Sequence, residues 1–442
     1  MNGSPRRWWR AGLALVCVAI AMRVANAFHY PMGWGFDESG NWRYVSTLLE
    51  AWTLPAPDAD WSTAHPPLYY WIAAALGRAL GDSDPAFTFF AVRLVGSAAG
   101  LLVAGLAAGL ALRVDPGNRR RALLAGALVL FLPAQIFTSA MLNEEVLASA
   151  FVSLAVVGAA TRQREALVGL AGGLAWLTKL SGVLAVAAVA AARLLDDARR
   201  GAAVRGVRGA AVVGLVALLV GGWFYARNRI VYGYFYAQDL PQHARMHTMP
   251  PGSRSAADYL RVPLATWTDP QMLNPDLLRS VWGSTWASLW FDAHRHFLPR
   301  ESAAVTRAGT VILLLALVPS AAFAVGFVRG IRRALAAPGP DTVLVLLVLF
   351  TLAGYALFTW RNPWFAAVKG SYLLGLSVPF GFYASEALDR WTAGRGVRAI
   401  ATWGALGALA VSVAAVFTFG DHFWSFEHLD YPGMRWTAPG SP

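Results

Sequence analysis

The feature that most constrains this sequence is a series of apolar runs, most of them about 18 to 25 residues long. A helix of about 20 apolar residues crosses the hydrocarbon core of a bilayer. Hydrophobic residues make up 57% of the chain and charged residues 14%, so several crossings are feasible. We therefore expect an all-α, polytopic integral membrane protein.

About eleven spanning segments are expected from these runs. They lie near residues 10–28, 88–112, 122–141, 146–160, 166–178, 181–195, 209–226, 305–328, 341–360, 370–387 and 399–419. The run 66–81 is short, opens with two prolines and contains Arg78. It is expected to form a juxtamembrane helix in the first outer loop instead of a span.

The charge distribution predicts the orientation, because short cytoplasmic loops carry the Lys and Arg excess. With the N-terminus inside, the inner side holds 20 of the 37 basic residues and 7 of the 25 acidic residues, so nearly all of the net charge of +12 lies there. The pI of about 10.2 therefore indicates topology, and we expect no nucleic-acid partner. Counting 66–81 as a span would invert the later loops.

Three regions are then expected on the non-cytoplasmic side: a first loop at 29–87, a large loop at 227–304 and a tail at 420–442. The N-terminal RRWWR, the apolar core and Ala25–Ala27 resemble a secretory signal peptide. Retention of this helix is favoured over cleavage, because the polar motif that follows needs an anchored helix. The single cysteine, Cys17, excludes a disulfide within the chain.

Ionisable residues gather at the expected outer ends of the spans. Such groups are costly at the membrane surface, so they indicate a functional site by default. The set comprises Asp37, Glu38, Arg93, Glu144, Glu145, Lys179, Arg227, Arg229 and Lys369.

Structural roles are the alternative for each of these residues. Arg227, Arg229 and Lys369 would snorkel to lipid headgroups, and Arg93 would form a buried salt bridge. Glu144 and Glu145 would terminate helices. Asp37 would cap the helix that follows it.

The chemistry that suits a carboxylate facing several fixed cations is sugar transfer from a lipid phosphate. The phosphate is itself a good leaving group, so no protein acid has to protonate the departing oxygen. A base must take the proton of the acceptor, and cations must hold the phosphate as negative charge develops. Direct attack would invert the anomeric centre.

Six segments resemble, in the same order, the protein O-mannosyltransferases and the lipid A aminoarabinose transferases, which share the membrane glycosyltransferase class C fold. They are FDE at 36–38, HPPLYY at 65–70, VRLVGS at 92–97, GLAWLTKLSG at 173–182, WFYARNRIVYG at 223–233 and KGSYLLGLSVP at 369–379. The likeness is good over about residues 1–235 and loose over about 341–385. Many relatives carry a soluble C-terminal domain after the last span and an Arg at the position of Ser371.

The resemblance implies a polyprenyl-phosphate sugar donor and transfer at the outer face. It makes Asp37 the base, Glu38 its neighbour and Arg93 a contact of the donor phosphate. Lys179, Arg229 and Lys369 are further candidates for the phosphate, Glu144 or Glu145 for the second acidic site, and His65 belongs to the first-loop motif. The catalytic membrane module would be 1–235, and 305–419 would hold the C-terminal transmembrane helices.

The large outer loop supplies weaker candidates. Trp282, Trp286 and Trp290 recur every four residues and would share a helical face, as an interfacial aromatic belt or as a sugar or lipid contact. No cofactor or metal is required. A divalent cation at the spaced pair His243 and His247, or at the cluster Asp292, His294 and His296, is the less favoured alternative.

We therefore expect a glycosyltransferase in a bacterial-type inner (plasma) membrane, with the active site on the non-cytoplasmic face. Its partners would be a polyprenyl-phosphate-linked sugar, membrane lipid and an outer-face acceptor that is a protein, a lipid or a glycan. The rivals are a transporter or flippase for the lipid-linked sugar and a non-catalytic relative. A transporter would carry an inverted repeat and polar residues through the whole membrane depth.

Overall fold

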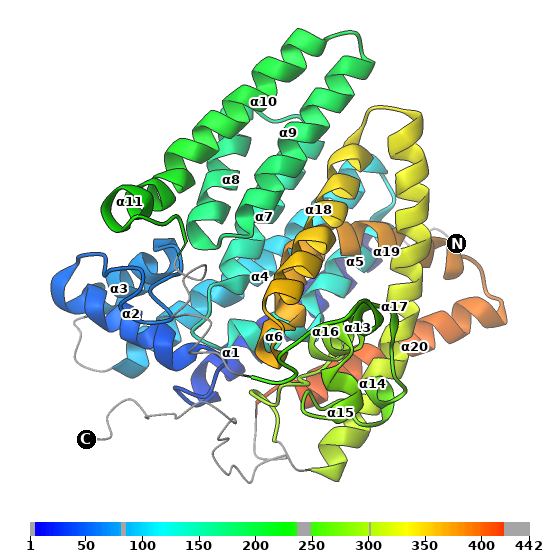
Figure 1. The fold of residues 1–442 in the computed structure, drawn as a ribbon. Coiled ribbons are helices and arrows are strands. Elements are labelled where there is room, and N and C mark those ends of the chain that lie inside the picture. Colours follow the sequence, from blue (N-terminus) through cyan, green and yellow to red (C-terminus); the bar gives the residue numbers. More distant parts are fainter. Residues whose placement is uncertain (1–4, 81–84, 237–248, 300–301, 420–442) are drawn as a thin grey trace.

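The computed structural model describes residues 5–80, 85–236, 249–299 and 302–419, and these fold into helices joined by turns (Figure 1). The first half of the chain contains α1 (Pro5–His29), α2 (Glu38–Ala51), α3 (Leu68–Ala79), α4 (Pro85–Val114), α5 (Arg119–Leu130), α6 (Pro133–Ser139), α7 (Glu145–Ala160), α8 (Glu165–Thr178), α9 (Gly182–Arg199), α10 (Ala203–Ala217), η1 (Leu218–Gly222) and α11 (Trp223–Tyr232). The second half contains α13 (Ala256–Leu260), α14 (Ala265–Thr268), α15 (Pro275–Leu278), α16 (Val281–Trp290), α17 (Ala303–Ala336), α18 (Pro340–Arg361), η3 (Phe365–Ala367), η4 (Gly370–Leu376), α19 (Ser377–Trp391) and α20 (Val397–Val416). The described ranges hold no β-strand, only an isolated bridge between Pro251 and Trp364, so the expected all-helical class is confirmed.

Seven segments of the described chain are long and apolar enough to cross a membrane. They are Trp8–His29, Pro85–Val114, Ala203–Tyr232, Ala303–Ala336, Pro340–Arg361, Phe365–Trp391 and Val397–Val416. The pair α5 and α6 would make an eighth, although its two helices meet at 50°. The bend falls where Pro133 opens α6 and Leu132 is extended, because proline has no N–H to donate and disfavours helical backbone at the residue before it.

Three of the expected spans fold as helices that do not meet these criteria. Helices α7 and α8 are apolar but have 16 and 14 residues, which at about 1.5 Å per residue is shorter than the ~30 Å hydrocarbon core. Helix α9 has 18 residues, but it ends in a charged segment, RLLDDAR. The count of eleven spans is therefore not confirmed, and the topology stays a prediction.

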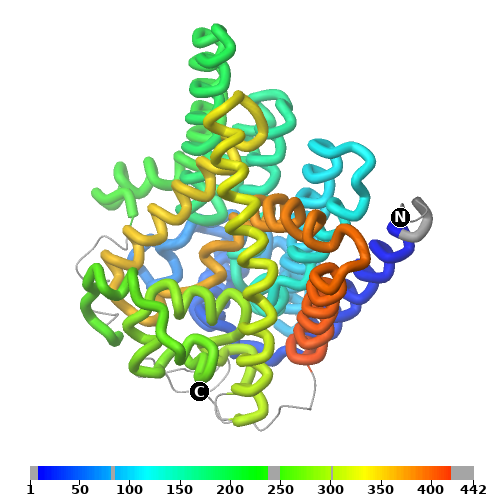
Figure 2. Tube along the Cα trace, turned by 90° about the vertical axis from the view of Figure 1, so that its right-hand side faces the viewer, coloured from blue at the N-terminus to red at the C-terminus, as the bar shows by residue number. Residues whose placement is uncertain are grey.

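The helices pack with chain neighbours and with more distant elements. Helix α4 contacts α5, α7 contacts α8, α9 contacts α10, and α17 contacts α19. The α9–α10 pair extends beyond the other helices in both views (Figures 1 and 2). Close approach relies on small residues: a Cβ placed on Gly326 of α17 would lie 2.0 Å from the carbonyl oxygen of Tyr383 in α19.

Two helices, α2 and α3, fold within the first loop and pack against each other. Helix α3 covers most of the run 66–81, and with 12 residues it is not among the candidate spans, as expected. Arg78, which argued against a span, donates from Nη2 to the carbonyl oxygen of Leu49 at 2.6 Å. Its guanidinium also lies over the Trp52 ring. The arginine thus ties α3 to the C-terminal end of α2.

The three tryptophans of the large loop lie on α16 and pack against other parts of the protein. Trp290 is 2% exposed and belongs to the main hydrophobic core. Trp286 packs on Trp290, with ring centroids 6.1 Å apart, and Trp282 packs on Tyr355 of α18. An interfacial belt is therefore wrong for Trp290, because this side chain is buried in the core. Trp282 and Trp286 are half-buried, and a place for them at the membrane interface stays a prediction.

Chain connectivity brings several polar segments to one end of the helix bundle. Asp37 directly precedes α2, and Glu144 directly precedes α7. Lys179 follows α8 at the tip of its hairpin with α9, and Lys369 directly precedes η4. These helix termini hold most of the candidate residues.

Candidate functional site

An ion pair joins the first loop to the segment before η4. Lys369 Nζ lies 2.7 Å from Asp37 Oδ2. Asp37 occupies the N-cap position of α2, but its side chain makes no capping hydrogen bond, and its φ of 63° is left-handed. The helix-capping alternative is therefore wrong in this structure, because the carboxylate is turned to Lys369. A strained backbone at a charged residue is typical of functional sites.

Opposing effects set the protonation of Asp37. Burial raises the pKa of this carboxyl, but Lys369, with smaller contributions from His65 and His296, lowers the pKa to about 2. The ammonium of Lys369 also lies over the ring of Phe36, 4.4 Å from its centroid. Asp37 is thus an anion at neutral pH while the ion pair is intact.

Glu38 and Arg93 form a second ion pair, which lies inside the protein. Arg93 Nη2 is 3.2 Å from Glu38 Oε1, and the same guanidinium donates to the carbonyl oxygens of Ala27, Tyr30 and Pro31. Glu38 is fully buried and accepts the backbone N–H groups of Gly35 and Leu142. The pair therefore holds the start of the first loop against α4 and the turn before α7.

The contacts of Arg93 are those of the structural alternative, a buried salt bridge. Its donors are directed at backbone carbonyls and at Glu38, and the side chain is 3% exposed. The expected contact with the donor phosphate stays a prediction.

Lys179 forms a third centre with the acidic pair before α7. Its Nζ lies 2.8 Å from Glu144 Oε1 and 2.6 Å from Glu145 Oε1. Burial lowers the pKa of Lys179, but the two carboxylates outweigh it and raise the pKa well above its ordinary value. Burial raises the pKa of Glu145, and the neighbouring Glu144 adds to that effect while Lys179 opposes it. Glu144 Oε2 is buried and accepts no hydrogen bond from the described residues.

Tyr372 of η4 joins the two lysine centres. Lys179 Nζ lies 4.8 Å from the centroid of its ring, and Lys369 Nζ lies 5.8 Å from it. Both ammonium groups therefore face one electron-rich ring. Lys179 and Lys369 are the only lysines of the sequence, against 35 arginines among its 37 basic residues.

His65 approaches the same cluster from the first loop. Its Nδ1 lies 3.0 Å from the Tyr70 hydroxyl and 3.7 Å from Glu144 Oε1. The Tyr70 hydroxyl donates to Asn41 Oδ1, so in the neutral ring Nδ1 donates to Tyr70 and Nε2 holds the lone pair. Burial lowers the pKa of His65, although Glu144 opposes the shift.

Arg229 is not placed with this cluster. It is exposed, donates to the carbonyl oxygen of Gly233, and lies over the ring of Phe235. The expectation that it contacts the donor phosphate is not supported, because the guanidinium binds the C-terminal end of its own helix, α11. Arg227 donates to the carbonyl oxygens of Leu54 and Pro55 and so ties α11 to the first loop.

Among the described residues, Asp292, His294 and His296 do not form a metal site. Asp292 Oδ2 accepts hydrogen bonds from the N–H groups of Phe297 and Leu298, so this carboxylate stabilises the loop to which it belongs. His294 and His296 stack with ring centroids 6.2 Å apart. Within the described ranges no group of three or more His, Cys, Asp or Glu side chains is arranged to hold a metal. His243 and His247 lie outside the described residues.

Sequence reasoning missed Tyr372, Asn41 and Tyr70. Asn41 donates to the carbonyl oxygen of Leu142 and so links α2 to the turn that carries Glu144. Tyr70 stands in HPPLYY and Tyr372 in KGSYLL, both quoted motifs. A tyrosine in a membrane segment reads as an interfacial residue, so its role needed the tertiary structure.

Comparison with known proteins shows the fold. No protein-family profile and no curated sequence matches this chain. The apo oligosaccharyltransferase of Archaeoglobus fulgidus superposes with a TM-score of 0.57 at 12% identity, over 94% of this chain and 56% of that chain. The same archaeal enzyme, AglB, in complex with an inhibitory peptide and a dolichol-phosphate gives a TM-score of 0.55 at 14% identity, over 94% of this chain and 56% of the other.

A bacterial structure is also similar. ArnT from Cupriavidus metallidurans, bound to undecaprenyl phosphate, superposes with a TM-score of 0.50 at 15% identity, over 92% of this chain and 75% of that chain. The chain spans about half the length of the archaeal enzyme. At these identities the likeness establishes the architecture alone: the chain has the fold of the class C membrane glycosyltransferases, as its motifs suggested.

Proposed function

We propose that the protein is a glycosyltransferase that moves a sugar from a polyprenyl-phosphate donor to an acceptor on the outer face of the membrane. The observation that carries the proposal is the cluster formed by Asp37–Lys369 and Lys179–Glu144–Glu145 around Tyr372. It lies in a fold shared with two enzymes whose structures contain a dolichol-phosphate or undecaprenyl phosphate. Buried acids and bases in that number are costly to maintain unless they serve binding or chemistry.

In this proposal Asp37 is the general base. The acceptor oxygen or nitrogen attacks the anomeric carbon, the bond from that carbon to the phosphate oxygen breaks, and the polyprenyl phosphate leaves with the electron pair. The acceptor proton passes to Asp37. Attack from the side opposite the phosphate inverts the anomeric centre.

The two lysines hold the donor phosphate. A phosphate that draws Lys369 away from Asp37 removes the largest influence lowering the pKa of Asp37, whereas burial continues to raise it. The carboxylate therefore becomes a stronger base when the donor is bound, which matches the need for a catalytic pKa nearer the working pH. Lys179, which lies beside Glu144, stabilises the negative charge that develops on the phosphate.

Glu38 and Arg93 are positioning residues in this scheme. They fix the loop that carries Asp37 and do not contact substrate. Glu144 and Glu145 hold Lys179 in place, and His65 adjusts the charge of Glu144. The mechanism requires no metal or other cofactor.

The side of the membrane on which the cluster lies follows from the predicted topology. Nearly all of the excess positive charge is expected on the inner side, which puts the cluster at the outer face of a bacterial-type plasma membrane. The donor then reaches the site from the outer leaflet. The acceptor is an outer-face protein, lipid or glycan.

The direct test uses purified protein in detergent with a panel of polyprenyl-phosphate sugars, and it measures free polyprenyl phosphate. Release with one donor, abolished in Asp37→Asn and retained in the exposed-carboxylate control Glu50→Gln, supports the proposal. Release that survives Asp37→Asn overturns the assignment of the base. Binding of every donor without release favours a lipid-linked sugar transporter or a non-catalytic relative. Adding EDTA during release tests the metal-independent mechanism, because a divalent-cation requirement would abolish the signal.

A further inference from the structure

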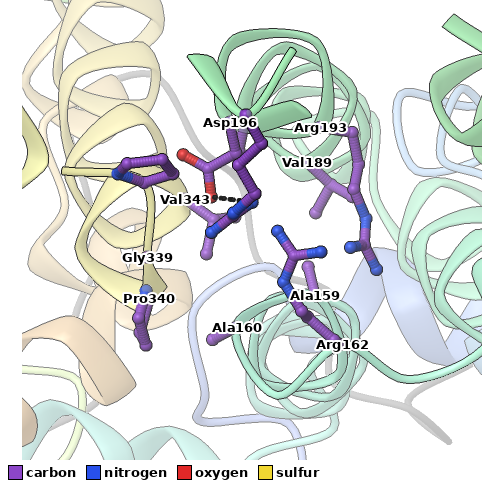
Figure 3. A pocket seen from close by; sticks show the side chains of 12 residues that line it. Ala159, Ala160, Arg162, Val189, Arg193, Asp196, Gly339, Pro340 and Val343 are labelled. Carbon is purple, nitrogen blue, oxygen red and sulfur yellow. Dashed lines mark ion pairs between the residues drawn. The ribbon is translucent and has the colours of Figure 1, made fainter. Parts of the chain in front are cut away.

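A cavity of about 240 Å³ lies at the other end of the bundle (Figure 3). Helix α7 begins at Glu145 in the lysine cluster and ends at Ala160 on the cavity wall. Its 16 residues separate the two ends by about 24 Å at 1.5 Å per residue. The cavity is therefore distinct from the proposed active site.

Arginines from two segments line this cavity. Arg162 follows α7, and Arg193 and Arg200 come from the last turns of α9 and the residue after it. Figure 3 shows the Arg162 and Arg193 side chains converging from separate elements, with Asp196 nearby. Asp196 is the one acidic residue in the lining.

The ion pairs of these arginines are long. Arg162 and Arg200 share Asp197 Oδ1 at 3.5 and 3.4 Å, and Arg200 lies 3.8 Å from Asp196. The lysine pairs at the other end lie between 2.6 and 2.8 Å. Guanidinium groups have five N–H donors, so the hydrogen bonds of Arg162 and Arg200 to Asp197 use only part of the donors of these two cavity-lining arginines.

Buried Arg193 adds an unsatisfied donor. Its side chain is 7% exposed, and its Nε donates no hydrogen bond to the described residues. Nη2 reaches the carbonyl oxygen of Gln163 at 3.3 Å and Glu165 at 3.5 Å. A buried polar atom without a partner costs free energy unless a ligand or water satisfies it.

The N-terminus of a long helix also faces this cavity. The 22-residue helix α18 begins at Pro340, and Gly339, Pro340 and Val343 form part of the wall. The positive end of a helix dipole favours negative charge. The acidic residue of its first turn, Asp341, is bound to Arg333 at 2.8 Å.

We propose that this cavity binds a phosphate group, most simply the headgroup phosphate of an anionic membrane lipid. Basic pockets between transmembrane helices bind such headgroups on the cytoplasmic side, and this end of the bundle is the predicted cytoplasmic end. The volume is below the ~300–1,000 Å³ of small-molecule sites, which suits a headgroup better than a whole substrate. The inference does not depend on the proposed glycosyl transfer.

The test measures binding of phosphatidylglycerol and of inorganic phosphate to the purified full chain in detergent. Arg162→Gln combined with Arg200→Gln should weaken phosphatidylglycerol binding about tenfold or more, because charge-assisted hydrogen bonds are lost. Arg164→Gln, an exposed arginine of the same loop that does not line the cavity, should leave binding within about twofold. Competition by inorganic phosphate identifies a site for phosphate itself, and binding of the lipid without competition identifies a headgroup site.

A second variant retains every charge. Ala160→Leu enlarges a side chain of the cavity wall and should also weaken binding, so the test stands even if the arginine variant does not fold. The proposal is overturned if neither probe binds the wild type, or if Ala160→Leu binds phosphatidylglycerol as tightly as the wild type does. Equal binding by a folded arginine double variant overturns it as well.

Discussion

Lys369 Nζ lies 2.7 Å from Asp37 Oδ2, although 332 positions separate the two residues in the chain. The sequence alone predicts that each of the two residues lies in a polar segment at the edge of the membrane. Their pairing brings the first loop and the segment before η4 into one centre.

Asp37→Asn should abolish sugar transfer while the protein still folds. Loss of a general base costs about 10²- to 10⁴-fold in rate, and the amide keeps the size of the side chain. Release of free polyprenyl phosphate, normalised to folded protein from size-exclusion chromatography, measures the effect. Glu50→Gln, an exposed carboxylate on α2, is the control and should retain activity. A rate within threefold of the wild type would exclude Asp37 as the base.

Lys369→Met should move the acid limb of the kcat/KM profile to higher pH. Lys369 lowers the pKa of Asp37 and burial raises it. Without the ammonium of Lys369, the effect of burial dominates and the pKa of Asp37 rises. The base is then protonated at a higher pH than in the wild type. The KM for the donor should rise as well, because one phosphate contact is lost. An unchanged acid limb would show that Lys369 does not govern the base.

Acid should reduce the stability difference between the wild type and Asp37→Asn. Asp37 has a folded-state pKa of about 2, below the value near 3.9 of an unfolded chain. Its contribution, about 2 kcal/mol, is therefore fully present above about pH 4 and is lost as the pH falls towards 2. Free energies of unfolding of both proteins between pH 6 and pH 2.5 measure this. A difference that stays constant over that range contradicts the ion pair.

Arg93→Gln should destabilise the fold strongly. It leaves Glu38 as a buried charge without its partner, which costs about 3–5 kcal/mol, and it removes three hydrogen bonds to backbone carbonyls. Arg43→Gln is the matched control, since the Arg43–Asp60 pair is exposed and such pairs contribute about 0–1 kcal/mol. Thermal unfolding compares the two variants. If Arg93 instead held the donor phosphate directly, its substitution would raise the KM with little change in Tm.

Gly370→Ala should impair activity by displacing the segment that carries Lys369. A Cβ at this position would lie 2.4 Å from the backbone nitrogen of Leu289, and the Gly370 N–H donates to Ser288 at 2.8 Å. Transfer activity and Tm should both fall. Gly404→Ala on α20 meets no atom within 4 Å and should be neutral or slightly stabilising, because alanine is the better helix former. Equal behaviour of the two variants would contradict the close contact between α16 and η4.

The arginines show most clearly which contacts the sequence predicted and which required the structure. A buried Arg93 was correctly expected to need an anion, but the residue pattern could not say whether that anion was a phosphate or Glu38. Arg229 was grouped with the cluster because it ends an apolar run, yet its guanidinium turns back to Gly233. Side-chain direction at a helix end depends on the neighbouring elements, which one sequence does not reveal.

Sequence alone determined that this chain is a helical membrane protein with its ionisable residues at the ends of helices, because the cost of burying charge in lipid acts on every segment independently of the others. The helix-end positions of Asp37, Glu38, Glu144, Glu145, Lys179 and Lys369 follow from that rule. Tertiary structure decided the partners: Lys369 with Asp37, Lys179 with both glutamates, and Arg93 with Glu38. Partner choice depends on packing between segments that are distant in the chain, and that information resides in the assembled bundle.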